Sequence, residues 1–281
     1  MTAATRQGWG LVAPALAWTT AFFLVPFAVM VAMSLATLEG RELQWGLSLA
    51  NYAEMAEKPY LRRAVVVSLE IAATVTVLSV LLAYPLAWIV AFHVPARWRR
   101  LALLLAILPF WTSYVVRSYA WLLVLGREGI VNDALLGLAL AAEPVQLAST
   151  RLATVTGFVH FFTMLLTLTI YANLVQLPPN LRRAAADLGA SGLQTFRHVI
   201  LPLTLPGIVT GAFLTFVLCI GDYVTPQILG GNTELTLPQL IMVQLGRRAD
   251  FPLAAALAVM LMAIVALAYL ACARWIRLDR L

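Results

Sequence analysis

Three charged residues interrupt long apolar stretches of the sequence, where a charge needs either a partner or water. They are Glu70, Arg117 and Asp222. Each would cost about 2.5–3.5 kcal/mol at the centre of a bilayer, even on the lenient insertion scale. A carboxylate at this depth attracts an ammonium group, and the rings of Trp111, Tyr114 and Tyr223 can add cation–π contacts. The chemistry that these residues offer is the recognition of a cation rather than the breaking of a bond.

The three charges allow two interpretations, which the sequence leaves open. Glu70 and Arg117 fall at similar depth on consecutive antiparallel segments, so a buried ion pair between them would fix helix register. Alternatively Asp222, with or without Glu70, lies on a substrate path, because nothing near Asp222 in the sequence neutralises it. His160 has no second His, Cys or acid at ligand spacing, which favours a hydrogen-bonded core histidine over a proton relay or pore-lining residue. The candidate path residues are Glu70, Trp111, Tyr114, Arg117, His160, Asp222 and Tyr223.

Several kinds of chemistry are excluded by the residues that the chain contains. Lys58 is its single lysine and no glycine closely precedes it, so the chain has no Walker A phosphate loop. Cys219 and Cys272 lie in apolar stretches and cannot form a four-ligand metal site. No basic run with stacking aromatics indicates a nucleic-acid partner. We therefore expect no catalytic residue, no metal and no cofactor in this chain.

The composition indicates an integral membrane protein. Of 281 residues, 62% are hydrophobic and 11% are charged, and the mean hydropathy is +0.89, whereas a soluble domain carries about 25% charged residues. A helix needs about 20 apolar residues to cross the hydrocarbon, so the apolar runs predict an all-α, polytopic protein with six transmembrane helices in one domain, residues 1–281. The predicted spans are residues 10–37, 64–92, 101–125, 152–177, 203–226 and 252–274, with a cytoplasmic loop at 178–202.

The distribution of arginine predicts the orientation of these spans. The short segments 1–9, 93–100, 178–198 and 274–281 are dense in arginine and have Asp187 and Asp279 as their acids. The longer segments on the other side balance their bases with acids. Because short cytoplasmic loops carry an excess of Arg and Lys, we expect both termini inside (N-in, C-in). The first apolar run is far longer than the core of a signal peptide and is expected to stay uncleaved.

The predicted loop after the fourth span is too regular for a tether. Prolines end the span, and Asn180 is placed to cap a new helix. Apolar residues then recur at helical spacing and predict one apolar face: Leu181, Ala184, Ala185 and Leu188. Gly189 and Gly192 are expected to break this helix, and a second short helix then precedes Pro202 and Pro206, which redirect the chain into the membrane. Such a helix is suited to docking into another protein, or alternatively to lying on lipid headgroups.

These loop residues resemble the EAA loop of permease subunits of ATP-binding-cassette (ABC) importers. The resemblance lies in Ala184, Ala185, Ala186, Asp187, Leu188, Gly189, Ala190, Ser191, Phe196, Pro202 and Gly207. In that family the segment is a coupling helix seated in a groove of the ATPase subunit. The resemblance therefore implies ATPase coupling for these residues: Ala184, Ala185, Asp187, Leu188, Gly189, Ala190, Ser191 and Phe196. It implies the same for Arg183, where the family carries a glutamate, so the local charge is inverted.

Further stretches narrow the resemblance. Residues 108–132 and 221–231 are similar to the third span and the end of the fifth span of spermidine/putrescine-type permeases. The resemblance implies a type I importer permease in the bacterial cytoplasmic (inner) membrane, surrounded by membrane lipid. Its substrate would be a small cationic solute such as putrescine or spermidine. Another small amine, an amino-acid derivative, an opine or an organophosphonate is the alternative.

The same resemblance implies a set of partners. These are an ABC ATPase dimer that binds ATP and Mg²⁺, a second permease subunit that differs from this chain, and an extracytoplasmic solute-binding protein. The segments 39–63 and 228–250 are the expected docking surfaces for the binding protein.

Two other classes of protein remain as alternatives. The stretch Gly189-Ala-Ser-Gly192 is similar to the nucleophile motif of rhomboid intramembrane proteases. A nucleophilic serine needs a base within hydrogen-bond reach, but Ser191 lies outside the spans and His198 is in the same loop rather than on a facing helix. An ion-coupled carrier or passive channel also fits the composition, although no repeat relates the first three spans to the last three.

Overall fold

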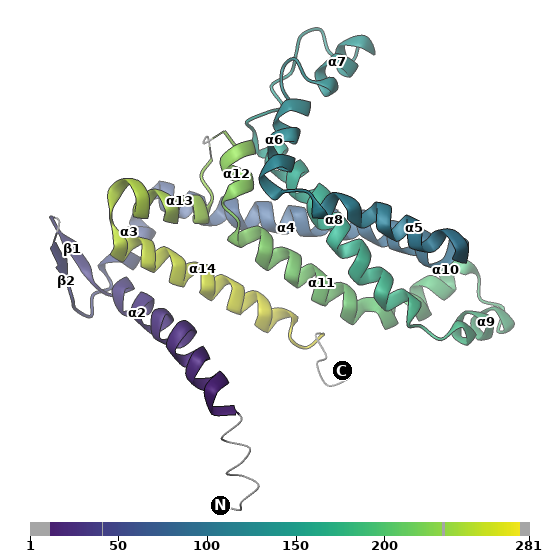
Figure 1. Ribbon diagram of the computed structural model, residues 1–281, viewed down its shortest axis with the longest axis horizontal. Coiled ribbons are helices and arrows are strands. Elements are labelled where there is room, and N and C mark those ends of the chain that lie inside the picture. The colour runs from purple at the N-terminus through teal and green to yellow at the C-terminus, as the bar shows by residue number, and fades with distance from the viewer. Residues whose placement is uncertain (1–11, 41, 232–233, 276–281) are drawn as a thin grey trace, which may run out of the picture. The chain divides into compact units, whose positions relative to one another are not determined.

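The computed structural model describes residues 12–40, 42–231 and 234–275 (Figure 1). Among these residues, five helices are long and apolar enough to cross a membrane: Val12–Ser34, Pro59–His93, Arg151–Val175, Gly192–Gly221 and Phe251–Cys272. The chain is mostly helical, as the sequence predicts. It forms two compact units, one from residues up to 63 with 240–263 and the other from 64–239 with residues from 264 onwards. The single-domain organisation stays a prediction.

The first unit begins with helix Val12–Ser34 and a short hairpin. Its elements up to residue 57 are the π-helical turn η1 (Thr20–Leu24), α2 (Val25–Ser34), the antiparallel strands β1 (Thr37–Glu39) and β2 (Glu42–Gln44), and α3 (Ala50–Glu57). The all-α prediction omits the hairpin. Asn51 in α3 donates from Nδ2 to the carbonyl oxygens of Ser34 (2.9 Å) and Ala36 (2.7 Å). Asn51 thereby supplies hydrogen bonds to carbonyl groups at the end of α2, because the last carbonyl groups of a helix have no donor within that helix.

The rest of the first unit comes from the C-terminal third of the chain. Its elements are the end of α13 (Leu237–Val243), the π-helical turn η5 (Gln244–Arg248) and the first half of α14 (Phe251–Cys272). Asp250 Oδ1 accepts the backbone N–H of Leu253 at 3.1 Å and so caps the start of α14. Arg248 donates to the hydroxyl of Tyr60 at 3.3 Å, which ties η5 to the first turn of α4 (Pro59–Trp88).

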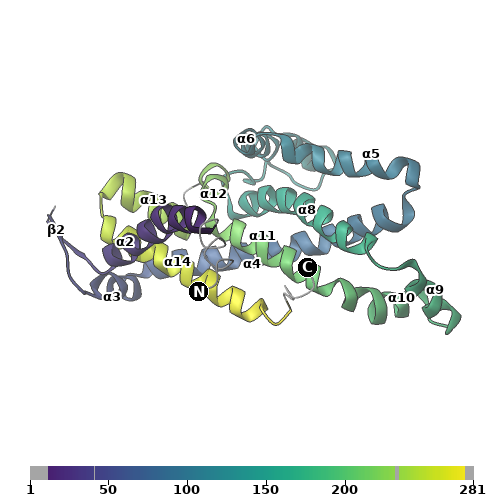
Figure 2. The ribbon, with the colours of Figure 1, turned by 60° about the horizontal axis from the view of Figure 1, so that its bottom comes forward.

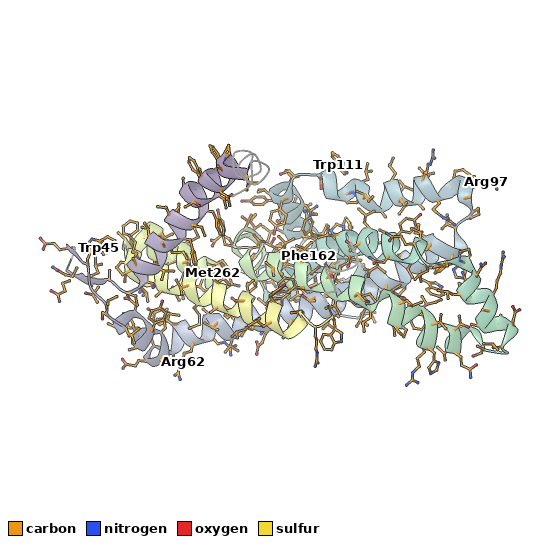
Figure 3. All side chains as sticks on the ribbon, turned by 90° about the horizontal axis from the view of Figure 1, so that it is seen from below. Trp45, Arg62, Arg97, Trp111, Phe162 and Met262 are labelled. Carbon is orange, nitrogen blue, oxygen red and sulfur yellow. The ribbon has the colours of Figure 1, made fainter. Side chains whose placement is uncertain are left out.

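The second unit holds the remaining helices. After α4 these are η2 (Ile89–His93), α5 (Ala96–Ile107), η3 (Leu108–Trp111), α6 (Tyr114–Val124), α7 (Ile130–Gly137), α8 (Arg151–Val175), α9 (Pro179–Asp187), α10 (Gly192–Thr195), η4 (Phe196–Ile200), α11 (Leu201–Gly221) and α12 (Val224–Leu229). Figures 1 and 2 both show α8 and α11 side by side. Phe162 of α8, labelled in Figure 3, is fully buried.

Small residues let α8 and α11 approach closely. A Cβ on Gly211 would lie 2.8 Å from Leu166 Cδ2, and a Cβ on Gly207 would overlap the side chain of Asn173. The buried residues of α11 recur at helical spacing and are mostly small or β-branched: Thr204, Ile208, Gly211, Thr215, Cys219 and Ile220. In lipid the hydrophobic effect does not drive helices together, because acyl chains are as apolar as the side chains. Helices therefore associate through close van der Waals packing of this kind. This pair is therefore the scaffold of the second unit.

The predicted third span, residues 101–125, is not a continuous helix. After Ile107, α5 gives way to the 3₁₀ turn η3, which contains Pro109; the backbone is extended at Thr112, and α6 starts at Tyr114. Proline has no N–H and its ring clashes with the preceding turn, which explains the interruption. The described residues thus contain five helices that are long enough to span a membrane. The predicted number of six spans requires that α5, η3 and α6 together form one crossing.

The predicted fifth span, residues 203–226, is also corrected at both ends. One helix runs from Gly192 to Gly221, so Pro202 and Pro206 do not separate a loop helix from the span. The π turn η4, in which Leu201 N–H donates to Phe196 O, directly precedes Pro202. A π turn shifts the hydrogen-bond ladder and so accommodates residues that cannot donate. At the other end Asp222 has extended backbone (ψ 132°) and lies between α11 and α12.

The predicted inner segments at the two ends of the chain lie mainly outside the described residues. The segments are residues 1–9 and 274–281, of which 1–9 and 276–281 lie outside the described residues, as do residues 10 and 11 of the first predicted span. The N-in, C-in orientation therefore stays a prediction.

We expect Gly157→Ala to destabilise the second unit by about 1–3 kcal/mol, the usual cost of overpacking. A Cβ on Gly157 would lie 2.5 Å from Leu229 Cδ1 and 3.5 Å from Thr225 Cγ2, and Leu229 is fully buried and cannot move aside. The measurement is thermal unfolding of the detergent-solubilised protein. The control is Gly137→Ala at the exposed end of α7, where no atom lies within 4 Å of the new Cβ. Equal losses of stability in both variants would contradict this account.

Candidate functional site

Two candidate path residues, Tyr114 and Asp222, meet where two helical segments are interrupted. The Tyr114 hydroxyl donates to Asp222 Oδ2 and also shares a hydrogen bond with the Thr225 hydroxyl. Tyr114 is the first residue of α6, Asp222 lies between α11 and α12, and Thr225 belongs to α12. Thr225 is buried and the other two are partly buried. We term these three residues the break site, because they join the two interruptions.

The Asp222 carboxylate also restarts the helix after the interruption. Its Oδ1 accepts the N–H of Val224 at 2.9 Å, and its Oδ2 accepts the N–H of Thr225 at 3.3 Å. Aspartate is favoured before a helix because it accepts N–H groups that have no partner within the helix. The carboxylate is therefore held in a fixed position by two backbone groups and one tyrosine.

Arg117 stabilises the other interruption. Its Nη1 donates to the carbonyl oxygen of Pro109 at 2.8 Å, at the turn where α5 ends. Its guanidinium lies 4.6 Å from the ring centroid of Phe161 and 5.5 Å from that of Tyr114. Both are cation–π distances, and Arg117 is buried, so these contacts replace water around the charge. Arg117 thus holds the start of α6 and contacts the break site through Tyr114.

The predicted ion pair between Glu70 and Arg117 is wrong. Glu70 instead accepts a hydrogen bond from Arg151 Nη2 at 2.7 Å, and Arg151 Nη1 lies 3.9 Å from Glu234. Arg151 is the first residue of α8, so this network joins α4, α8 and the segment before α13. The Glu70 side chain is 46% exposed. The network lies at the surface and is separate from the break site.

The remaining path candidates are His160, Trp111 and Tyr223, of which Tyr223 directly follows Asp222 in the chain. His160 Nδ1 accepts a hydrogen bond from Trp121 Nε1 at 3.0 Å, as expected of a hydrogen-bonded core histidine. Trp111, labelled in Figure 3, is 84% exposed, and Tyr223 is exposed as well. The structure therefore brings together Tyr114, Arg117 and Asp222 from the predicted set. The roles predicted for all seven residues stay predictions.

A cavity of about 10 Å³ lies beside Asp222, among side chains that include Phe158, Cys219 and Thr236. This volume corresponds to about one water molecule. In this conformation the cavity has no room for a solute next to the carboxylate.

The 178–202 segment forms two helices joined by a tight turn. The first, α9, begins at Pro179 after Pro178 as its N-cap residue. Asn180 therefore lies in the first turn and does not cap the helix, contrary to the prediction. Gly189 has φ of 80°, a value that favours glycine, and its N–H donates to Ala186 O at 2.9 Å. The predicted end of the helix at Gly189 is confirmed.

Ser191 starts the next helix through a capping box. Its Oγ accepts the Gln194 N–H at 3.3 Å, and Gln194 Oε1 accepts the Ser191 N–H at 2.7 Å. Gly192 is therefore the first residue of a helix and does not break one. His198 Nδ1 pairs with Gln194 O at 3.1 Å. Ser191 thus acts as a helix cap, and this histidine is engaged elsewhere, so the pair does not form a serine–base couple.

Aromatic side chains fasten this segment to the end of α4. The Phe196 ring packs edge-on against Tyr84 and Trp88, with centroids 5.6 and 5.5 Å apart. The Arg182 guanidinium lies 4.4 Å from the ring centroid of Phe92. Both α9 and η4 are therefore attached to the same end of the α4–η2 helix.

Most of the residues predicted to couple to an ATPase are exposed. Of the four residues expected to form one apolar face, Ala185 alone is buried, and Leu188 lies just after the end of α9. Leu188 is 88% exposed and Leu193, after the turn, is 75% exposed. The other exposed members are Arg183, Ala184, Asp187, Gly189 and Ser191, whereas Ala190 and Phe196 are partly buried. Leu188 and Leu193 thus form an exposed apolar surface beside the turn.

Sequence reasoning missed Thr225, Phe161 and Arg151. An aspartate that closely precedes a short apolar run is a readable signal for the start of a new helix, and Thr225 lies in the first turn of that helix. Arg151 follows the capping residue Thr150 and is the first residue of α8. The sequence therefore offered a second arginine at a helix end as a partner for Glu70. No sequence signal places Phe161 under Arg117, because that contact depends on how α6 and α8 pack.

The comparisons with known proteins agree with one another. A family model described as a binding-protein-dependent transport system inner membrane component matches residues 46–277. The spermidine/putrescine transport system permease protein PotB of Salmonella typhimurium is 32% identical over 251 residues, covering 89% of this chain and 87% of that protein. The inner membrane ABC transporter permease protein YdcU of Escherichia coli is 36% identical over 217 residues, covering 73% and 68% of the two chains.

A solved structure extends the likeness to the fold. It is a bacterial alginate ABC transporter in complex with an alginate pentasaccharide-bound periplasmic protein. One of its chains matches with a TM-score of 0.75 and 15% sequence identity, and the match covers 96% of this chain and 93% of that one. At this identity the likeness concerns the fold alone.

We expect Ser191→Ala to loosen the start of the Gly192–Gly221 helix by about 0.5–2 kcal/mol, the usual cost of losing an N-cap. The substitution removes the oxygen that accepts the Gln194 N–H. The measurement is amide hydrogen exchange over residues 192–196, which should become faster. Ser191→Thr keeps a capping hydroxyl and should retain most of the protection. Equal loss of protection in both variants would show that the hydroxyl does not cap this helix.

Proposed function

Because this chain belongs to the binding-protein-dependent transport system inner membrane components, we propose that it is one permease subunit of an ATP-driven importer for a small cationic solute. A polyamine such as putrescine or spermidine is the first candidate. The family assignment confirms the resemblance found in the sequence. It makes the chain a multi-pass inner-membrane protein and a component of a transport system, not an enzyme.

The exposed leucines of the 178–202 segment are the observation that carries the ATP-driven part of this proposal. Leu188 and Leu193 present apolar surface at the turn between α9 and α10, which favours burial against another protein. We infer that the ATPase subunit, which would bind ATP and Mg²⁺, covers this turn. Arg183 is exposed on α9. It offers a bidentate donor to a carboxylate on the ATPase, where related permeases present a glutamate.

The break site is the proposed gate of the solute path. Interrupted helices at membrane depth persist where the irregular backbone is buried or lines a path, and discontinuous helices carry the sites of many transporters. Asp222 is held by Tyr114 across two such interruptions. Separation of the two side chains would turn the carboxylate towards a passing ammonium group, while the Tyr114 ring stays close enough for a cation–π contact.

The substrate class follows from this carboxylate together with the similarity to a permease named for spermidine and putrescine. The alternative substrates are another small amine, an amino-acid derivative, an opine or an organophosphonate. An anionic substrate would not be favoured by a carboxylate at the gate.

For the assembly, we propose six crossings with both termini inside, the third crossing being α5, η3 and α6 together. A second, different permease subunit would complete the path, and two ATPase subunits would bind below. An extracytoplasmic binding protein would deliver the solute to segments 39–63 and 228–250. The likeness of this chain to one from a transporter solved with its periplasmic protein supports a binding protein of this kind.

The first test is the set of proteins that co-purify with this chain in mild detergent, identified by mass spectrometry. We expect an ABC ATPase and a second permease. Leu188→Ser should reduce the recovered ATPase several-fold, because it removes an apolar contact, and should leave the second permease in place. Leu138→Ser changes an equally prominent leucine, 70% exposed after α7, and should have no effect. Recovery of the chain without an ATPase, under conditions that preserve a known importer, would contradict the proposal.

Asp222→Asn should reduce uptake of the solute by about tenfold or more, which corresponds to about 1.4 kcal/mol of lost attraction. The side-chain oxygen of asparagine can still accept a backbone N–H at the start of α12, so α12 should form and the complex should assemble. The measurement is uptake of labelled putrescine or spermidine into proteoliposomes that contain the whole complex, together with the yield of that complex. Asp133→Asn, an exposed change in α7, is the matched control. Unchanged uptake kinetics in Asp222→Asn would remove this carboxylate from the mechanism.

A further inference from the structure

A large pocket lies beside the 178–202 segment and is not used by the proposed transport path. Its volume is about 750 Å³, within the range of pockets that hold organic ligands. All of its described lining residues belong to the second unit. They come from the end of the α4–η2 helix, from α5, from the end of α8, and from the stretch between Pro178 and Leu203.

The walls of this pocket are mainly apolar. They include Trp88, Phe92, Leu174, Leu177, Ile200 and Leu203. Leu174 and Ile200 are buried, whereas Leu203 is 51% exposed. The apolar wall is thus continuous from the core of the second unit to its surface. A wall of this kind can accommodate a ligand with a long hydrocarbon chain.

The polar part of the pocket is basic. Arg99, Arg182 and Arg183 line it, and no acidic side chain is among its described lining residues. Arg99 Nε is buried without a hydrogen-bond partner, and Arg99 Nη2 makes a long contact of 3.5 Å with the carbonyl of Val94. A buried guanidinium donor without an acceptor is costly. An anion that enters the pocket would remove this cost.

Arg182 is already positioned for the same anion. Its guanidinium lies over the Phe92 ring at 4.4 Å and near the Trp88 ring at 6.0 Å. A guanidinium that stacks through its face still donates through its edge, and arginine is well suited to phosphate for this reason. Two arginines from separate elements, α5 and α9, therefore border one apolar pocket.

The position of the pocket along the helices selects an amphiphile. It lies where the spanning helices Pro59–His93 and Arg151–Val175 end, so one part faces the hydrocarbon and the other faces the headgroup layer. Basic pockets between helices at this level are suited to acidic lipid headgroups. A phosphate with acyl chains satisfies both the arginines and the apolar wall.

We propose that this pocket binds an anionic phospholipid, with the phosphate held by Arg99 and Arg182 and an acyl chain along Trp88, Leu174 and Leu203. The lipid would join α5 to α9, two elements that the aromatic contacts of Phe196 do not link. It would thereby stabilise the 178–202 segment. This inference does not depend on the identity of the transported solute.

The test uses the complex purified from its native membrane, stripped of lipid with detergent and supplied with phosphatidylglycerol or phosphatidylcholine in mixed micelles. Phosphatidylglycerol should raise the thermal midpoint by about 2–4 °C, whereas phosphatidylcholine should have little effect. Arg99→Gln should lose most of this rise. Arg100→Gln removes the same charge from the next, exposed residue of α5, which does not line the pocket, and should keep the full rise.

Three further measurements test the source of the anion, the role of the Arg99 charge and the location of the lipid. Inorganic phosphate at millimolar concentration should not reproduce the rise, and an equal rise would show a site for a free anion and overturn the lipid proposal. Arg99→Lys should recover part of the effect, since it restores the charge. If Arg99→Gln does not fold, a photoreactive phosphatidylglycerol on the unmodified complex replaces it. Labelling of residues 174–203 would support the proposal, and labelling confined to other segments would overturn it.

Equal rises in Arg99→Gln and Arg100→Gln would reduce the effect to general attraction between acidic lipid and a basic protein surface, and the pocket would not be a lipid site. A phosphatidylglycerol effect that appears only after the ATPase subunits have been removed from the complex would instead identify a segment of the ATPase as the occupant. That result would also overturn the proposal. Neither result bears on the proposed transport function, which the co-purified partners test separately.

Discussion

The structure depends on one constraint, which is that a polar group inside a membrane-spanning segment needs a partner within the protein. The second unit breaks two of its helical segments, one at Pro109 and one at Asp222, and each break releases backbone groups. Asp222 accepts two N–H groups of the restarted helix, and Arg117 donates to the Pro109 carbonyl. Tyr114 then joins the two breaks. The charges that make the sequence unusual are therefore the groups that make the breaks stable.

A second consequence concerns how movement passes along the chain. The helix Gly192–Gly221 is 30 residues long, or about 45 Å at 1.5 Å per residue. It starts at the capping box of Ser191 and ends immediately before Asp222. Because the two prolines near its start are accommodated within it, the segment that carries Leu188 and Leu193 and the break site lie at opposite ends of one helix. A displacement of the first by an ATPase would act on the second without an intervening hinge at the prolines.

The comparison of Glu70 with Asp222 shows how position changes the role of a carboxylate. Both interrupt apolar stretches, yet Glu70 is at the surface with Arg151, whereas Asp222 is held between helices. The distance along a span places both at similar depth but says nothing about which side of the helix each occupies. The predicted pair of Glu70 and Arg117 failed for this reason, since depth alone does not decide which side chains face one another.

The sequence by itself determined the membrane class, five of the spans and the turn at Gly189, because apolar length and local turn chemistry are properties of the chain. It also determined the family, through the motif residues of the 178–202 segment. It also singled out Tyr114, Arg117 and Asp222. The tertiary structure alone decided that Tyr114 bonds to Asp222, that Arg117 lies over Phe161, and that Arg99 and Arg182 border one pocket. These contacts join residues far apart in the sequence, and they depend on how the helices of the second unit pack against one another, which no local pattern encodes.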